Sequence, residues 1–208
     1  MTVCYFTASG NCLYVARRIG GTLLSIPQLM RQEKIEIEDD AVGIVCPVYA
    51  VELPFMIVDF MKRAEIKTDY FFFILTCGYG YEVSLGHAEV AARERGWDLK
   101  YGNGALMVDN YLPFFDMDEE IRKLPEKDVE GQLDTICADI QARKEQRVML
   151  TPELKAQMEE ILDEKGRVIL EKLKPLIYDE EGFSYHTLGE SFAASFKTGA
   201  EFKKSIGR

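Results

Sequence analysis

Residues 3–17 read VCYFTASGNCLYVAR, and this stretch holds a complete strand–loop–helix unit. The apolar run Val3–Phe6 is typical of a buried strand, and the spacing of apolar residues from Cys12 to Ile19 indicates a helix. The residues between them, 7–11, are small or polar. They fit a tight turn with a helix N-cap, or an anion cradle built from hydroxyls and free backbone N–H groups. The local chemistry leaves both interpretations open.

Further strands and helices alternate along the chain. The runs Ala41–Cys46 (AVGIVC) and Tyr70–Leu75 (YFFFIL) are apolar almost throughout, as in parallel strands that are covered on both faces. Weaker strands are expected at 23–29, where Pro27 favours a sheet edge, and at 99–108. Helices are expected at 12–19, 54–63, 82–95 and 125–147. This alternation predicts an α/β fold with a doubly wound parallel sheet. Five strands within about 147 residues fit the flavodoxin-like order 2-1-3-4-5.

The pattern changes after residue 147. Thr151 and Pro152 form a good helix start, and residues 154–173 have helical spacing with many charges. Residues 178–208 mix glycine, serine, aromatic and charged residues without clear periodicity. We therefore predict a main domain over residues 1–147, and a C-terminal helical extension with a tail over residues 148–208.

Composition excludes several classes of protein. The chain has 208 residues, of which 47% are hydrophobic and 29% charged, as in an ordinary globular domain. Its net charge of -10 argues against nucleic acid as a partner. It has no stretch of about 18 apolar residues, so no membrane span is expected, and no signal peptide is visible.

Cysteine usage indicates a reducing compartment. The five cysteines are dispersed and form no C-x-x-C motif. This pattern fits reduced thiols in the cytoplasm, and it supplies neither a zinc site nor an iron–sulfur site. His87 and His186 have no neighbouring ligand pattern, so no metal is expected.

Ligands of doubly wound sheets bind beyond the carboxyl ends of the strands, where the strand order reverses. That rule selects three loops, at residues 7–12, 47–52 and 76–81. All three have an unusual composition, which favours a ligand over a plain turn at residues 7–11.

The first loop, Thr7-x-Ser9-Gly10-Asn11-Cys12, resembles the phosphate loop of flavodoxins, T/S-x-T/S-G-N-T/S. The stretches CPVYAVELP (46–54) and MVDNYLP (107–113) also resemble recurrent stretches of flavodoxin domains that often precede a bis-(4Fe-4S) ferredoxin domain. The resemblance covers roughly residues 2–145. Cys12 departs from the pattern, because its thiol is a weak donor where the family has a hydroxyl; we expect weakened binding.

The resemblance implies that FMN is the cofactor of the domain at residues 1–147. The first loop would hold its phosphate, and the other two loops would flank its isoalloxazine ring, with Tyr49 and either Tyr79 or Tyr81 as aromatic neighbours. The candidate cofactor-binding residues are Thr7, Ala8, Ser9, Gly10, Asn11, Cys12, Pro47, Val48, Tyr49, Ala50, Thr76, Cys77, Gly78, Tyr79, Gly80, Tyr81 and Asn110.

Plainer interpretations exist for parts of this set. The tyrosines fit ordinary loop aromatics, Cys46 and Cys77 fit buried structural thiols, and residues 109–111 fit a plain turn. Cys12 and Arg18 match the C-x5-R spacing of phosphatase loops. The residues between them are apolar and helical, which disfavours a loop of inward-pointing amides.

Other classes of protein lack support. A phosphorelay receiver needs an aspartate where this chain has Cys46 and Pro47, and the Walker A and G-x-G-x-x-G patterns are absent. The acidic segments 36–40 and 116–120 are expected to be solvated loops.

The favoured function is electron transfer by an FMN-binding protein, with no catalytic residue assigned. The alternatives are an FMN-dependent NAD(P)H oxidoreductase of the quinone reductase type, and an interaction module without cofactor. The resemblance implies a redox partner protein of the ferredoxin type. That partner is expected to be separate or outside this sequence, because the chain lacks the C-x2-C-x2-C-x3-C-P runs of such a domain.

Overall fold

The computed structural model describes residues 1–49, 51–110 and 115–160. Residues Met1–Glu159 form one compact unit. The predicted boundary at residue 147 stays a prediction, because most of the predicted extension lies outside the described residues.

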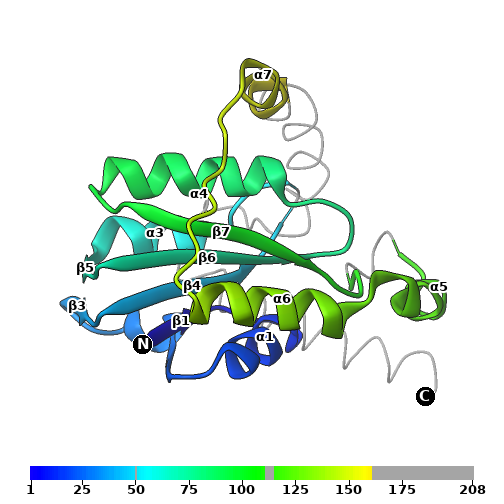
Figure 1. Cartoon of the computed structure of the whole chain (residues 1–208), viewed down its shortest axis with the longest axis horizontal. Coiled ribbons are helices and arrows are strands. Elements are labelled where there is room, and N and C mark those ends of the chain that lie inside the picture. The colour runs from blue at the N-terminus through cyan, green and yellow to red at the C-terminus, as the bar shows by residue number, and fades with distance from the viewer. Residues whose placement is uncertain (50, 111–114, 161–208) are drawn as a thin grey trace, which may run out of the picture. The chain divides into compact units, whose positions relative to one another are not determined.

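A five-stranded parallel sheet forms the centre of this unit, in the order β2-β1-β4-β6-β7 (Figure 1). Counted along the chain within this sheet, the order is 2-1-3-4-5, so the predicted fold class is confirmed. The strands of the sheet are β1 (Thr2–Tyr5), β2 (Thr22–Ser25), β4 (Ala41–Pro47), β6 (Tyr70–Cys77) and β7 (Leu99–Leu106).

Helices cover both faces of this sheet (Figure 1). One face packs against α1 and α6, and the other against α2, α3 and α4. Their bounds are α1 (Asn11–Ile19), α2 (Ile26–Leu29), α3 (Phe55–Arg63), α4 (Glu82–Glu94) and α6 (Val129–Gln141).

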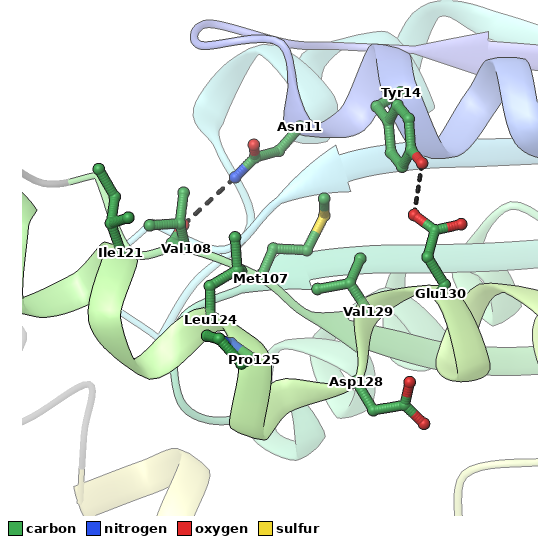
Figure 2. Close-up of a pocket in the computed structure, with 10 residues that line it drawn as sticks. All are labelled: Asn11, Tyr14, Met107, Val108, Ile121, Leu124, Pro125, Asp128, Val129 and Glu130. Carbon is green, nitrogen blue, oxygen red and sulfur yellow. Dashed lines mark hydrogen bonds between the residues drawn. The ribbon is translucent and has the colours of Figure 1, made fainter.

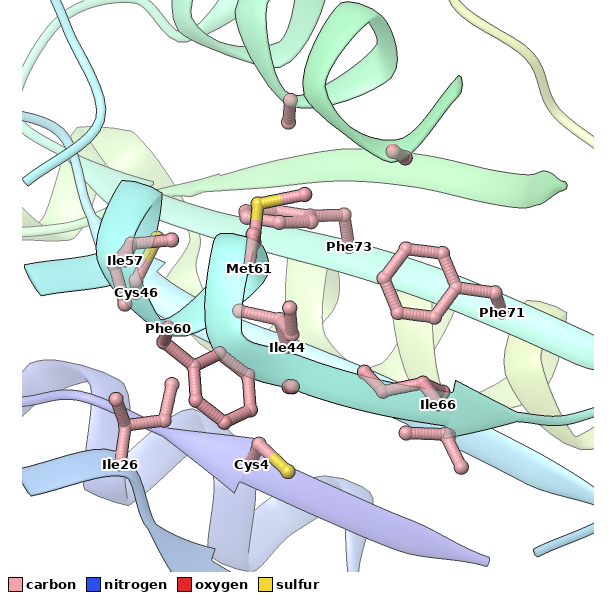
Figure 3. Close-up of a cluster of buried hydrophobic side chains, with 14 of the residues drawn as sticks. Cys4, Ile26, Ile44, Cys46, Ile57, Phe60, Met61, Ile66, Phe71 and Phe73 are labelled. Atoms are coloured by element: carbon pink, nitrogen blue, oxygen red, sulfur yellow. The ribbon is translucent and has the colours of Figure 1, made fainter. Parts of the chain in front are cut away.

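Strand β6 shows why the apolar runs are continuous. Phe71 and Phe73 enter the core under α3 and α4 (Figure 3). Leu75 belongs to the same core. Phe72 and Ile74 enter the core under α1 and α6. Successive side chains of a strand point to opposite faces, so a strand buried on both faces needs apolar residues at every position.

A second, two-stranded parallel sheet pairs β3 (Ile35–Glu38) with β5 (Ala64–Lys67). The expectation that residues 36–40 form a solvated loop is wrong over β3. Ile35 and Ile37 are buried, and Glu36 and Glu38 point to solvent. The acidic residues are therefore the exposed half of a strand with period two.

Two other predicted elements differ from the structure. The strand expected at 23–29 ends at Ser25, and Pro27 lies in the first turn of the short helix α2, where a missing N–H costs nothing. The helix expected at 125–147 is divided at Asp128. This residue has a left-handed φ of 44°, and its side chain caps α6 by accepting a hydrogen bond from Gly131 N–H.

The chain after α6 leaves the helix and follows the edge of β7. Gln146 N–H donates to Lys100 O at 2.8 Å, and Gly102 N–H donates to Gln146 O at 3.0 Å. These bonds satisfy backbone groups at the sheet edge. The helix itself ends just before Arg143, which has a left-handed φ of 50°.

Helix α5 (Met117–Lys123) and the 3₁₀ turn η1 (Leu124–Lys127) precede α6. The expectation that residues 116–120 form a solvated loop is wrong as well. The Asp116 side chain caps α5 by accepting from Glu119 N–H at 3.0 Å, and Glu120 is buried.

The last described helix is α7 (Pro152–Glu160), which begins at the predicted site. Leu154 N–H donates to the Thr151 hydroxyl at 3.2 Å. None of the helices in the described part of the chain combines the length and apolar character that crossing a bilayer requires.

Candidate functional site

Four loops meet at one edge of the main sheet, because β1, β4, β6 and β7 are parallel and end there. From β1 the chain passes to β2 on one side of β1, and it later returns to form β4 on the other side. The strand order therefore reverses between β1 and β4. This is the position at which open α/β sheets bind ligands. It brings the three predicted loops together with residues 107–110.

The loop after β1 forms a tight turn into α1. Gly10 N–H donates to the Thr7 hydroxyl oxygen at 3.0 Å, and Gly10 has a φ of 108°. Only glycine adopts such a conformation without strain. Nothing lies within 4 Å of the point where a Gly10 side chain would begin, so the turn faces open space.

The start of α1 presents positive charge to this space. The first backbone bond of the helix runs from Tyr14 N–H to Gly10 O at 2.9 Å, so the amides of Asn11, Cys12 and Leu13 precede the intrahelical ladder. The first turn of the helix has no acidic residue. Ala8 and Ser9, in the turn before it, are exposed. An anion is the ligand that such a helix end stabilises.

Cys12 faces inward from the same turn. Its thiol lies 3.1 Å from the hydroxyl of Thr76, which is buried at the end of β6. Burial raises the pKa of the Cys12 thiol to about 12, so it stays protonated at neutral pH. A phosphatase nucleophile needs the thiolate, and this environment opposes it.

The loop after β4 folds back as a turn between Tyr49 and Glu52, whose backbones exchange two hydrogen bonds of 3.0 Å. Val51 adopts a φ of 69°, which is unusual for a β-branched residue. The Ser84 hydroxyl of α4 donates to Val51 O at 2.7 Å and holds the turn. Ala50 lies outside the described residues, and Pro47 ends β4.

Tyr49 lies half-buried at the base of this turn. Its ring meets Phe6 edge-on, with centroids 6.2 Å apart and an interplanar angle of 77°. Its hydroxyl is buried and has no hydrogen-bond partner among the described residues. Burial, with the Cys12 and Cys46 thiols nearby, raises the pKa of Tyr49 well above its usual value.

Val48 N–H donates to Thr76 O at 2.9 Å, which joins the second loop to the third. Glu52 adds a contact that the sequence did not reveal, because its partner His87 lies on α4. Glu52 Oε2 is 2.6 Å from His87 Nδ1. Both side chains close the second loop against α4.

The loop after β6 is held against the end of β7. Met107 N–H donates to Cys77 O at 2.8 Å. A side chain on Gly78 would lie 2.4 Å from the Asp109 side chain, so only glycine fits there. The next glycine, Gly80, has more room, since its nearest neighbour would be the Glu82 carboxylate at 3.3 Å.

The two tyrosines of this loop point in different directions. The Tyr81 ring lies directly against Gly104 of β7, and its hydroxyl donates to Asn103 Oδ1 at 3.1 Å. Tyr79 is 59% exposed, and its hydroxyl donates to Glu120 Oε1 at 3.0 Å. Tyr81 therefore packs on the sheet, and Tyr79 lies against α5.

Side chains join the loop after β7 to the loop after β1. Asn11 Nδ2 donates to Val108 O at 3.3 Å, and Asn110 Nδ2 donates to Ser9 Oγ. Tyr111 lies outside the described residues. A pocket of about 530 Å³ opens beside these contacts (Figure 2). It is lined by Asn11, Tyr14, Met107, Val108, Ile121, Leu124, Pro125, Asp128, Val129 and Glu130.

Sequence reasoning missed three residues beside the third loop: Glu120, Lys123 and Lys127. Glu120 is 1% exposed, and Lys123 Nζ lies 2.7 Å from its Oε1. Hydrogen bonds from Lys123 and Tyr79 lower the pKa of Glu120. The Asp-x-x-Glu capping pattern at residues 116–119 was the signal for a helix here.

No family model matches the chain, and no curated protein matches it. Among solved structures, the chain is similar to one from Bacteroides uniformis that is described as a "Putative flavoprotein", with 15% identity and a TM-score of 0.39. That similarity covers 50% of this chain and 88% of the other.

Proposed function

We propose that this protein binds FMN and carries electrons for a separate redox partner. The observation that supports this most directly is the Gly10 turn, which opens the positive end of α1 at the strand-order reversal. A phosphate monoester fits that position, because hydroxyl groups of the loop and the backbone N–H groups at the start of α1 are close to it. No acidic residue occupies the first turn of the helix.

The donor set also fits the rest of FMN. The second loop offers Tyr49, whose buried hydroxyl lacks a partner among the described residues, as a site of polar contact for a bound ring. In the third loop, Gly78 leaves room for the Asp109 side chain, so this loop lies close to the loop after β7. Such surroundings suit a flat aromatic group with polar edges.

When bound, FMN supplies the redox chemistry, and the chain binds and orients it. Thr7 and Gly10 shape the turn that receives the phosphate. Ser9 is held by Asn110, which fixes the loop beside the end of β7.

We further propose a cytoplasmic protein with a basic redox partner of the ferredoxin type. All five cysteines are free in the structure, as in a reducing compartment. The net charge of -10 favours association with a basic surface. The flavodoxin domains that this sequence resembles are often fused to a ferredoxin domain, which supports this choice of partner.

The test is a flavin titration of the purified chain, followed by fluorescence quenching. FMN is expected to bind near one equivalent, and riboflavin at least tenfold more weakly, because it lacks the phosphate. FAD is expected to bind weakly too, because the described residues show no adenine site. Absence of flavin binding, both as isolated and after reconstitution, would refute the proposal. Rapid NAD(P)H oxidation with a quinone, without any added reductase, would favour the oxidoreductase alternative.

A further inference from the structure

Lys127, at the end of η1, binds the ends of two neighbouring strands at once. Its ammonium donates to Gly78 O at 2.9 Å and to Met107 O at 2.7 Å. Gly78 is the first residue beyond β6, and Met107 is the first beyond β7. Both residues are buried, and the Lys127 side chain is only 12% exposed. A single side chain thus bridges the third loop and the loop after β7.

Glu120 compensates the charge of this buried ammonium. Its Oε2 lies 3.7 Å from Lys127 Nζ, and it has no hydrogen bond within the described residues. Its other oxygen accepts from the Tyr79 hydroxyl and from Lys123 Nζ. A buried ammonium is tolerated only with such a counter-charge, and two buried carbonyls need a donor. Glu120 and Lys127 therefore depend on each other.

Tyr79 is fixed by the same cluster. Its ring lies 5.6 Å from the Phe115 ring, measured between centroids. The ammonium of Lys127 lies 5.4 Å from the Tyr79 centroid, and that of Lys123 lies 6.0 Å from it. Cation–π attraction and the bond to Glu120 oppose rotation of Tyr79.

We propose that Lys127, balanced by Glu120, is a positioning residue for flavin binding. It holds residues 76–81 and 107–110 together as one wall of the site. This inference rests on the proposed function, because these residues form a wall of the flavin site only if flavin binds at this edge of the sheet. Without Lys127, the carbonyls of Gly78 and Met107 lose their donor, and the two loops separate to reach water. FMN binding then has to order both loops again, which costs free energy and weakens binding.

The test compares Lys127→Met, Glu120→Gln and Lys127→Arg with wild type, using two measurements. The first is the FMN dissociation constant from fluorescence quenching. The second is amide hydrogen exchange of the flavin-free protein, resolved at residues 78–80 and 107–109 and, as an internal reference, in β4. Lys62→Met is the matched control, because Lys62 lies exposed in the last turn of α3.

We expect Lys127→Met to raise the FMN dissociation constant at least tenfold and to speed exchange at residues 78–80 and 107–109 at least tenfold, with β4 unchanged. Glu120→Gln should act in the same direction. Lys127→Arg should recover to within about threefold of wild type, because it keeps the charge and the donors. If Lys127 merely filled space, Lys127→Met would bind FMN like wild type, because methionine fills a similar volume. Lys62→Met should match wild type.

Unchanged binding and unchanged local exchange in Lys127→Met would overturn the inference. So would exchange that rises equally in β4, because Lys127 would then stabilise the whole domain. If wild type binds no FMN while exchange still rises only in the two loops, the proposed function fails and the bridge between the loops stands.

Discussion

The side-chain amide of Asn11 donates a hydrogen bond to the backbone oxygen of Val108 at 3.3 Å, across 97 positions of sequence. The same helix start is joined to Asn110 through Ser9. The loop after β1 and the loop after β7 therefore form one structure, and a change in either loop is expected to alter the conformation of both.

Gly10→Ala should weaken FMN binding and lower the free energy of unfolding by about 1–2 kcal/mol, because alanine is strained at a left-handed φ. Gly96→Ala is the matched control, since Gly96 also has a left-handed φ, of 72°, with open space around it, but lies after α4. Urea unfolding should show similar losses for both variants, and FMN titration a loss for Gly10→Ala alone. Equal FMN affinity in the two variants would place the ligand elsewhere.

Cys12→Thr should raise the free energy of unfolding by about 1 kcal/mol, because a hydroxyl makes a stronger hydrogen bond than the weakly donating thiol. The Cys12 thiol faces inward, 3.1 Å from the Thr76 hydroxyl, so the threonine has that neighbour to hydrogen-bond. Urea unfolding measures the effect, with Cys137→Thr on α6 as the control. A lower free energy of unfolding in Cys12→Thr would show that the packing at this position requires the thiol itself.

Stability should fall at high pH. Burial raises the pKa values of Cys4 and Cys12 from 9.0 to about 12, so between these values the folded protein holds protons that the unfolded chain releases. The free energy of unfolding therefore decreases as pH rises above 9, by about 1.4 kcal/mol per pH unit for each thiol. Urea unfolding at pH 8 and pH 10 measures this slope.

Cys12→Ser is the internal check on that slope, because serine does not titrate in this range. Its slope should be shallower than that of wild type by the contribution of one proton. An unchanged slope would mean that the Cys12 thiol ionises alike in the folded and unfolded chains.

Tyr49→Phe should stabilise the flavin-free protein by about 1 kcal/mol, because it removes a buried hydroxyl that has no partner among the described residues. The same change should weaken FMN binding if the ring satisfies that hydroxyl. Tyr70→Phe is the control: its hydroxyl donates to Lys144 O at 2.8 Å, so this variant should lose stability. Thermal unfolding with and without FMN measures both effects, and a loss of stability in both variants would contradict the assignment.

Much of the fold could be predicted from the sequence, because its signals are local. The apolar run of β6 predicted a strand buried on both faces, and Phe71 and Phe72 enter opposite cores. The small polar residues after β1 predicted a turn into a helix, and Gly10 forms it. The parallel arrangement followed from the alternation of strands and helices, since parallel strands need crossover connections.

Only the tertiary structure decided which side chains meet at the sheet edge. Nothing local separates Tyr79 from Tyr81, yet one lies against Glu120 and the other against Gly104. Lys127 reaches Gly78 across 49 positions of sequence, and no spacing rule encodes such a contact. Periodicity follows from the geometry of one strand or helix, whereas these contacts depend on how several elements pack, so the sequence determined the elements and the packing determined the site.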